Sequence, residues 1–415
     1  MRAGIVVTGS ELVRGDRTDL NGPFLARSLL GLGFEPAELR IVGDVRGDIE
    51  AAIRDGLRHD LLITSGGLGP THDDLTVELL ALAAGRELVV NSEVEATIEA
   101  RSRAVAERMN RPYTDFAFGV RKQATLPEGA IVAGIAGTAP AVVLEVEGCV
   151  AVTLPGPPRE LQDLWSAVLE TEPLRRLVAA AQPRERRALR FYGVGESTVA
   201  QALAAAGGEG DGVEVTICAR DSEIHLDLFV APGADARADA LEAALVEPVG
   251  SYLFSRTEEP IEALVLEACR ARGLTLATAE SCTGGLVAGR LTGIAGASDV
   301  FLGSVVSYSN EVKESELGVP AATLEAHGAV SAETASAMAR GVRGRLGADV
   351  AVSVTGIAGP GGGTPEKPVG LVYLCASGPG GELGRHFQVT ADRETVRRRA
   401  TVGALHLLHQ LVTEM

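Results

Sequence analysis

The feature that most constrains this chain is the alternation of short apolar runs with amphipathic stretches over about its first 165 residues. This alternation is typical of βαβ units built around a mostly parallel sheet. Strands are predicted at residues 4–8, 60–64 and 150–154, with helices near residues 21–32 and from about residue 75. Each of these strands runs into a turn that contains glycine or proline. Because ligands bind at the carboxyl ends of strands in open α/β sheets, these turns are the first places to look for a site.

The pattern changes near residue 170 and again near residue 257. Residues 188–253 predict a small α+β module, with strands at 189–192, 214–219 and 223–229 and a helix at 197–206. Alternation then resumes, with strands predicted at 275–279, 348–355 and 370–376. We therefore predict an α/β protein with two three-layer α/β domains, residues 1–168 and 256–415, joined by a small α+β domain at 169–255.

Charge, cysteine usage and hydropathy exclude several classes of protein. The 415 residues include 38 Lys plus Arg and 55 Asp plus Glu, and the net charge of −17 argues against a non-specific nucleic-acid coat. Five scattered cysteines without a CxxC pair favour reduced thiols in a cytoplasm. The most apolar stretch, residues 130–144, is broken by glycines and a proline, so it predicts no membrane span.

The first candidate site is the run SGGLGPTHDDLT, residues 65–76. Its glycines, Gly66, Gly67 and Gly69, leave backbone N–H groups free to approach an anion at the start of a helix. Asp73 and Asp74 suit a hard cation such as Mg²⁺. The alternative is that one of these aspartates caps the helix beginning near residue 75. Glu11, in the turn after the first strand, and the tight loop at 137–140 are expected to join this edge.

The second candidate site is the run AESCTGGL, residues 279–286, which lies between a predicted strand and a predicted helix. A nucleophile on such a turn is well exposed, and the N–H groups that follow it can bind an oxyanion. Ser281 and Cys282 are both possible nucleophiles. Only three lysines occur among the 38 basic residues, and one of them, Lys313, is the best candidate for a base because arginine does not lose its proton. The alternative is that Ser281 caps the helix and that Cys282 is a small buried hydrophobic residue. A histidine base is not expected, because His406 and His409 are predicted to lie at the surface.

The runs TGSEL, SGGLGPTHDDLT, GTAP and LPGPP together resemble the N-terminal domain of the CinA (competence/damage-inducible protein A) family, which is similar to molybdopterin-binding domains. The pattern differs at Gly134, where Asn is expected, and at Ala141, where Gly is usual. The resemblance implies a metal-dependent pyrophosphatase that cleaves ADP-ribose to AMP and ribose 5-phosphate. It implies that Asp73 and Asp74 hold the metal or position water, and that substrate is bound by Gly66, Gly67, Gly69, Glu11, Asn21 and Lys122.

The runs AESCTGGL, YSNEVK, GAVS and TGIAGPGGGTPEKPVG, with the pair at 392–393, resemble the C-terminal CinA domain. That domain is similar to nicotinamide-nucleotide amidase, which converts nicotinamide mononucleotide (NMN) to nicotinic acid mononucleotide and ammonia. The resemblance implies Ser281 as nucleophile, Lys313 as base and Tyr308 as an assisting hydroxyl, with no cofactor for this step. Substrate contacts are expected from Cys282, Thr283, Gly284, Gly285, Asn310, Thr355, Gly356 and Arg393.

Two other classes of function stay open at this stage. One is a non-catalytic competence or DNA-damage adaptor that associates with the recombinase RecA. The other is an N-terminal domain that binds molybdopterin instead of cleaving ADP-ribose. The family resemblance also suggests at least a homodimer.

Overall fold

The structure is a computed structural model that describes residues 1–415. It contains two compact units, the first made of residues 1–185 and 230–235 and the second of residues 186–229 and 236–415. The strands of the small middle module therefore belong mainly to the same unit as the C-terminal domain. None of the helices combines the length and apolarity needed to cross a membrane.

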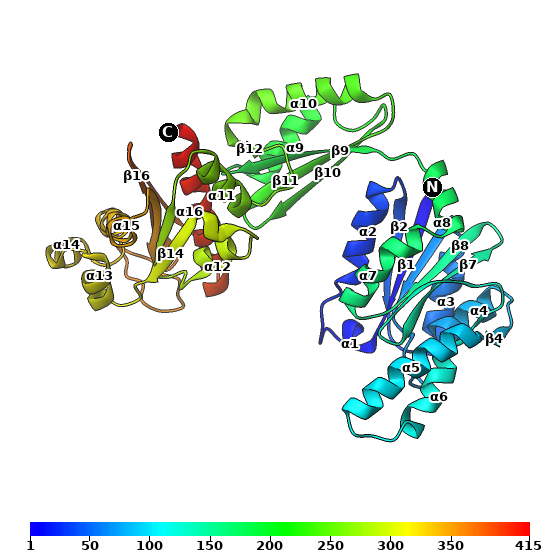
Figure 1. Ribbon diagram of the computed structural model, residues 1–415. Coiled ribbons are helices and arrows are strands. Elements are labelled where there is room, and N and C mark those ends of the chain that lie inside the picture. Colours follow the sequence, from blue (N-terminus) through cyan, green and yellow to red (C-terminus); the bar gives the residue numbers. More distant parts are fainter. The chain divides into compact units, whose positions relative to one another are not determined.

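The first unit is built on a six-stranded sheet in the order β2-β1-β3-β8-β7-β6 (Figure 1). Its first four strands are parallel, and β7 and β6 are antiparallel additions. The strands are β1 (Arg2–Thr8), β2 (Glu35–Val42), β3 (Leu61–Ser65), β6 (Ile131–Ala136), β7 (Ala139–Val146) and β8 (Cys149–Leu154), and β4 (Leu88–Val90) pairs with β5 (Thr125–Pro127). The helices are α1 (Ser10–Val13), α2 (Asn21–Gly31), α3 (Arg46–Gly56), α4 (Thr76–Ala83), α5 (Ser92–Arg108), α6 (Thr114–Gln123), α7 (Pro158–Leu169) and α8 (Glu172–Ala180).

Alternation along the central strands creates the three layers of this unit, because successive side chains of a strand point to opposite faces. Ile5 of β1 packs in a core with α2, α7 and α8, whereas its neighbour Val6 packs in a second core with α3 and α4. In β3, Ile63 belongs to the first of these cores and its neighbour Leu62 belongs to the second. The predicted three-layer arrangement is therefore present in this unit.

The second unit contains two sheets, ordered β10-β11-β9-β12 and β14-β13-β15-β16-β17. The first comprises β9 (Glu185–Tyr192), β10 (Val213–Arg220), β11 (Glu223–Val230) and β12 (Leu253–Ser255), with helices α9 (Glu196–Ala205) and α10 (Asp235–Val249). The second comprises β13 (Leu276–Glu280), β14 (Phe301–Val306), β15 (Val350–Gly356), β16 (Leu371–Gly378) and β17 (Gly381–Gln388). Its helices are α11 (Ile261–Ala271), α12 (Leu286–Thr292), α13 (Asn310–Leu317), α14 (Ala321–His327), α15 (Ala332–Leu346) and α16 (Arg393–Glu414). Strands β14, β13 and β15 are parallel, and β16 and β17 are antiparallel.

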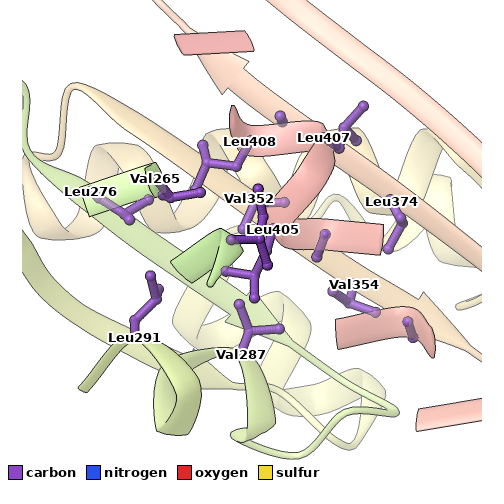
Figure 2. Close-up of a cluster of buried hydrophobic side chains, with 14 of the residues drawn as sticks. Val265, Leu276, Val287, Leu291, Val352, Val354, Leu374, Leu405, Leu407 and Leu408 are labelled. Carbon is purple, nitrogen blue, oxygen red and sulfur yellow. The ribbon is translucent and has the colours of Figure 1, made fainter. Parts of the chain in front are cut away.

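Helices cover both faces of the five-stranded sheet. Figure 2 shows one of the two cores, in which Val352 and Val354 of β15 pack among side chains of α11, α12 and α16. Ala351, which directly precedes Val352, packs on the opposite face in a core with α13, α14 and α15. The α/β fold class predicted from the sequence is thus confirmed.

The surface position expected for His406 is wrong. His406 on α16 is only 6% exposed, its Nε2 lies 2.7 Å from Glu223 Oε1, and its ring stacks on Tyr192 at 3.7 Å between centroids. Both partners belong to the middle module. The polar character of histidine predicted exposure, but this nitrogen has a partner brought to it by a strand 183 residues away in the sequence.

Candidate active sites

The C-terminal candidate site lies where three parallel strands end. Ser281 directly follows β13, Ser307 directly follows β14, and Thr355 is near the end of β15. The N–H of Ser281 donates to the carbonyl of Val354 at 2.9 Å, and the N–H of Ser307 donates to the carbonyl of Glu280 at 2.8 Å. Because β13 has a parallel neighbour on each side, this edge of the sheet is the place where α/β folds bind ligands.

Ser281 and Lys313 meet at this edge. Lys313 Nζ lies 3.1 Å from Ser281 Oγ and donates to the carbonyl of Ser307 at 2.7 Å. The lysine side chain comes from α13 and is only 1% exposed. Burial lowers the pKa of Lys313 below its usual 10.5, because a desolvated ammonium is unfavourable, although the Cys282 thiol acts in the opposite direction. The lysine is therefore positioned and electrostatically biased to accept a proton from Ser281.

The interpretation of Ser281 as a helix cap is wrong. Helix α12 begins after Gly285, which has a φ of +99° and offers no side-chain cap. The buried carboxylate of Glu280 takes that role, accepting from the N–H groups of Gly285, Val287 and Ala288 at 2.8–3.1 Å. Ser281 Oγ is thereby left to face Lys313.

The backbone N–H groups of the nucleophile turn, residues 281–285, fall into two sets. The N–H of Gly284 donates to the carbonyl of Ser281, and the N–H of Gly285 donates to Glu280. The N–H groups of Cys282 and Thr283 donate to no backbone carbonyl. Of the four residues predicted to contribute oxyanion donors, only Cys282 and Thr283 therefore retain one.

A cavity of about 190 Å³ adjoins the Ser281–Lys313 pair. It is lined by seven of the predicted site residues, Ser281, Cys282, Tyr308, Lys313, Thr355, Gly356 and Arg393, and also by Ala329, Val330 and Ala358. Arg393 Nη2 donates to the Tyr308 hydroxyl at 2.9 Å and Nη1 donates to the carbonyl of Gly359 at 2.8 Å. Asn310, Thr283, Gly284 and Gly285 do not line the cavity.

Sequence reasoning missed two groups at this site. The carbonyl of Ser307 orients Lys313, but no side-chain pattern marks a backbone acceptor. Arg397 of α16 donates to the carbonyls of Cys282 and Thr283, which lie more than 110 residues earlier in the chain. It lies one helical turn beyond Arg393, which the sequence did indicate, so helical spacing on α16 was the available signal.

The N-terminal candidate site is a wider pocket of about 540 Å³ at the carboxyl ends of β1, β3 and β8. The N–H of Gly66 donates to the carbonyl of Leu154 at 3.0 Å, which joins the ends of β3 and β8. The expectation that this N–H is free to approach an anion is therefore wrong for Gly66. Predicted residues that line the pocket are Glu11, Asn21, Gly66, Gly67, Asp73 and Asp74. Gly69 and Lys122 lie just outside the lining: a Cβ on Gly69 would come 2.5 Å from Asp74 Oδ2, and Lys122 Nζ donates to the carbonyl of Thr71.

Neither Asp73 nor Asp74 caps a helix, so that interpretation is wrong. Helix α4 begins at Thr76, and no side chain caps it. Instead, the Thr71 hydroxyl lies 2.5 Å from an oxygen of each aspartate, and the Thr71 N–H donates to Asp74 at 2.8 Å. The bond from this hydroxyl lowers the pKa of Asp73 below its usual value. Asp73 is thus stabilised in its ionised form on the rim of the pocket, with Asp74 beside it.

The donor set of this pocket fits Mg²⁺ in a limited way. No three His, Cys, Asp or Glu side chains are arranged to hold an ion by themselves. Mg²⁺ often takes only one or two carboxylates and completes its coordination with water and substrate phosphates, which Asp73 and Asp74 can satisfy. Asn21 adds an acceptor: it is 4% exposed, its Nδ2 donates to Ser65 and Gly156, and its buried Oδ1 has no partner.

The two departures from the expected N-terminal pattern are neighbours in space. Gly134 of β6 pairs with Ala141 of β7, and neither residue lines the pocket. The differences therefore concern the antiparallel edge of the sheet and lie away from the parallel strand ends.

The folds and sites define a protein with two α/β domains, each with a pocket at the carboxyl ends of its parallel strands. Residues 4–175 match the family model described as probable molybdopterin binding domain, and residues 258–412 match the model described as CinA C-terminal domain. A CinA-like protein from Mycolicibacterium paratuberculosis is 44% identical over 434 residues, covering 100% of this chain and 99% of the relative. Another from Mycobacterium tuberculosis is 42% identical and covers 99% of this chain and 97% of the relative. The chain belongs to the CinA family.

Some solved structures are similar to part of this chain. The competence/damage inducible protein CihA from Agrobacterium tumefaciens is 44% identical, with a TM-score of 0.36, over 38% of this chain and 99% of that chain. A CinA superfamily protein from Klebsiella pneumoniae is 34% identical, with the same TM-score, over 38% of this chain and 100% of that chain. The family resemblance stated from the motifs is confirmed by the full-length relatives.

Proposed function

We propose that this chain hydrolyses two nucleotides at two separate sites, and that the C-terminal site deamidates NMN to nicotinic acid mononucleotide and ammonia. The observation that carries the proposal is the buried Lys313 Nζ, 3.1 Å from Ser281 Oγ at the end of β13. A desolvated lysine beside a serine hydroxyl is an arrangement suited to acyl transfer, because the neutral amine can take the serine proton. Cys282 is a poorer nucleophile here, because burial raises the pKa of its thiol to about 11.

The reaction would run in two halves. Ser281 Oγ attacks the carbonyl carbon of the nicotinamide amide while its proton passes to Lys313 Nζ. The tetrahedral intermediate collapses, the C–N bond breaks, and Lys313 returns the proton to the departing nitrogen, which leaves as ammonia. Water then attacks the Ser281 ester with Lys313 again as base, releasing the nicotinate carboxylate and restoring the serine.

The remaining groups of the cavity support this chemistry. The N–H of Cys282, a residue that lines the cavity, would stabilise the oxyanion, and the N–H of the peptide that joins Cys282 to Thr283 would be a second donor, since neither is engaged by a backbone carbonyl. Arg393, with Thr355 and Gly356 beside it, would hold the nucleotide phosphate. The hydroxyl of Tyr308, held by Arg393, would assist at the cavity mouth.

For the N-terminal site we propose hydrolysis of ADP-ribose to AMP and ribose 5-phosphate. The support is a pocket of nucleotide size that is lined by Gly66 and Gly67 and by the carboxylates of Glu11, Asp73 and Asp74. A Mg²⁺ ion on Asp73 or Asp74 would reduce the negative charge of the diphosphate that water attacks. Lys122 would position the Thr71 segment, and Asn21 Oδ1 and Glu11 would accept hydrogen bonds from the substrate.

One experiment tests both halves of the proposal. Purified full-length protein is assayed for ammonia release from NMN and for AMP release from ADP-ribose, with EDTA and with added Mg²⁺. EDTA is expected to abolish AMP release and to leave ammonia release unchanged. Loss of both activities together would contradict two independent sites. Absence of both with Mg²⁺ present, together with comigration with a recombinase, would favour the adaptor alternative.

A further inference from the structure

The carbonyl side of the nucleophile turn is held by one arginine. Arg397 Nε donates to the carbonyl of Cys282 at 3.1 Å, and Nη2 donates to the carbonyl of Thr283 at 2.8 Å. The contact is close: a Cβ placed on Gly284 would come within 3.4 Å of Arg397 Nη2. One guanidinium group therefore donates hydrogen bonds to two successive peptide carbonyls of the turn.

The support for Arg397 is rigid. It lies on the 22-residue helix α16, between the fully buried Val396 and Ala400, which belong to the main core of the C-terminal domain. A side chain fixed on a packed helix holds its partners more accurately than one on a loop. The guanidinium also has no carboxylate partner in the structure, so its charge is directed at the two carbonyl oxygens.

The consequence follows from the geometry of the peptide bond. In a trans peptide the C=O and the N–H point in opposite directions, so fixing the carbonyl of Cys282 also fixes the N–H of Thr283. Hydrogen bonding to a cation on the oxygen side polarises the same peptide and makes its N–H a stronger donor. The N–H of Thr283 is one of the two donors of the turn that no backbone carbonyl engages. Thr283 does not itself line the cavity, but Cys282, whose carbonyl belongs to the same peptide, does, so this peptide adjoins the cavity.

We propose that Arg397 is a positioning residue for the amidase reaction, which orients and polarises the Cys282–Thr283 peptide as the oxyanion donor. This inference rests on the proposed amidase function and adds a residue to it. Arg397 does not line the cavity beside Ser281 and Lys313, although it lines a second pocket that also includes Arg393, so its proposed action is through the peptide.

The test compares Arg397→Ala with Arg398→Ala in full-length protein. Arg398 is the adjacent residue on α16, exposed and 3.9 Å from Asp221, and it contacts no part of the turn. We expect Arg397→Ala to lower kcat for NMN by roughly 10- to 100-fold, less than the 10²–10³ typical of deleting an oxyanion donor outright, with little change in KM. Arg398→Ala is expected to match the wild type.

Chemical rescue distinguishes positioning from a general structural role. Guanidinium ion, added well below denaturing concentrations, should restore much of the lost kcat to Arg397→Ala and have no such effect on the wild type or Arg398→Ala. Arg397→Lys, which keeps the charge but not the fork, should be intermediate. The pH at which the amidase rate begins to fall should be unchanged, because Lys313 is untouched.

The other results would overturn the inference. Unchanged kcat in Arg397→Ala, a loss without rescue, or a loss mainly in KM would each show that Arg397 does not position the donor. A loss of activity that disappears in a Cys282→Ala background would mean that Arg397 acts on the thiol, since the guanidinium also opposes the raised pKa of Cys282. Failure of the amidase proposal is distinguishable, because then the wild type and Arg398→Ala would also release no ammonia.

Discussion

The two pockets occupy equivalent places in their domains but have opposite chemical character. Each lies beyond a strand with a parallel neighbour on both sides, β1 in the first unit and β13 in the second. The N-terminal pocket of about 540 Å³ is rimmed by carboxylates and glycines, whereas the C-terminal cavity of about 190 Å³ adjoins a buried lysine. The same strand geometry therefore carries the site that we propose for phosphate and metal in one domain and the site that we propose for acyl transfer in the other.

The largest expected effect separates the two sites by mutation. Ser281→Ala and Lys313→Arg should each lower NMN deamidation by roughly 10³-fold or more, because the nucleophile or the base is lost. ADP-ribose hydrolysis by the same proteins should be unaffected. Ammonia and AMP assays on each variant measure this.

Cys282→Ala is the matched control, since the thiol lies next to Ser281 and should be dispensable. Inactivity of Cys282→Ala with retained activity of Ser281→Ala would assign the chemistry to the cysteine and remove the contrast between the sites.

A stability effect that belongs to the second unit alone involves Glu223. Burial raises the pKa of Glu223, but the hydrogen bonds from His225 and His406 have a larger effect and lower it. The pKa of Glu223 is therefore about 2 in the folded protein, compared with 4.5 in an unfolded chain. Its stabilising contribution, on the order of 3 kcal/mol, is therefore present above about pH 4.5 and is lost as the pH falls towards 2. Glu223→Gln should lower the melting temperature of this unit at pH 7.

The acid range provides the control for Glu223. The difference between Glu223→Gln and the wild type should shrink as the pH falls from 4.5 towards 2, because the carboxylate of the unfolded chain binds a proton in this range and that of the folded chain does so only near pH 2. A difference in melting temperature that is independent of pH would contradict an ionised Glu223.

A backbone effect in the first unit concerns Gly67. Its φ of +67° is unfavourable for other residues, and a Cβ would come 2.2 Å from Thr76 Oγ1. Gly67→Ala should destabilise the N-terminal unit by about 2 kcal/mol and reduce ADP-ribose hydrolysis, leaving NMN deamidation intact.

Gly47→Ala is the matched control for Gly67→Ala, because it lies in α3 with nothing within 4 Å of an added Cβ. It should be neutral or stabilising by up to ~1 kcal/mol. Equal effects of the two substitutions in thermal unfolding would show that the glycine loop carries no special strain.

The smallest effect is a difference in pH dependence between the two sites. Lys313 must be neutral to act as base, so kcat/KM for NMN should fall about tenfold per pH unit below its pKa. Burial places that pKa below 10.5, and the rate should reach its plateau below that pH. ADP-ribose hydrolysis should not show this decrease in rate at lower pH. An NMN plateau reached only at pH 10.5 or above would contradict a desolvated lysine.

Much of the fold followed from local pattern. The predicted strands at 60–64 and 150–154 correspond to β3 and β8, and the helix at 21–32 corresponds to α2, because alternation and glycine turns report local backbone structure. Helix α10 (Asp235–Val249) was not predicted. It contains Pro248 and only a few buried side chains, so its apolar period is weak.

Local pattern was least reliable where a polar side chain had a distant partner. Asp73, Asp74 and Ser281 all precede helices, and the cap interpretation was reasonable for each. In the structure both aspartates accept hydrogen bonds from Thr71, and the N–H groups at the start of α12 are capped by Glu280, which precedes the serine. Position relative to a helix does not determine which of several neighbouring acceptors reaches its N–H groups.

The sequence by itself determined the strand–turn–helix segments, the residue types they carry and the family. It indicated Lys313 because lysine is rare here and can lose a proton, whereas arginine cannot. Only the tertiary structure decided that Lys313 is buried 3.1 Å from Ser281, that the Ser307 carbonyl orients it, and that Arg397 grips the nucleophile turn. These contacts join residues 6 to 115 positions apart, and they depend on which strand ends meet and which helix packs over them.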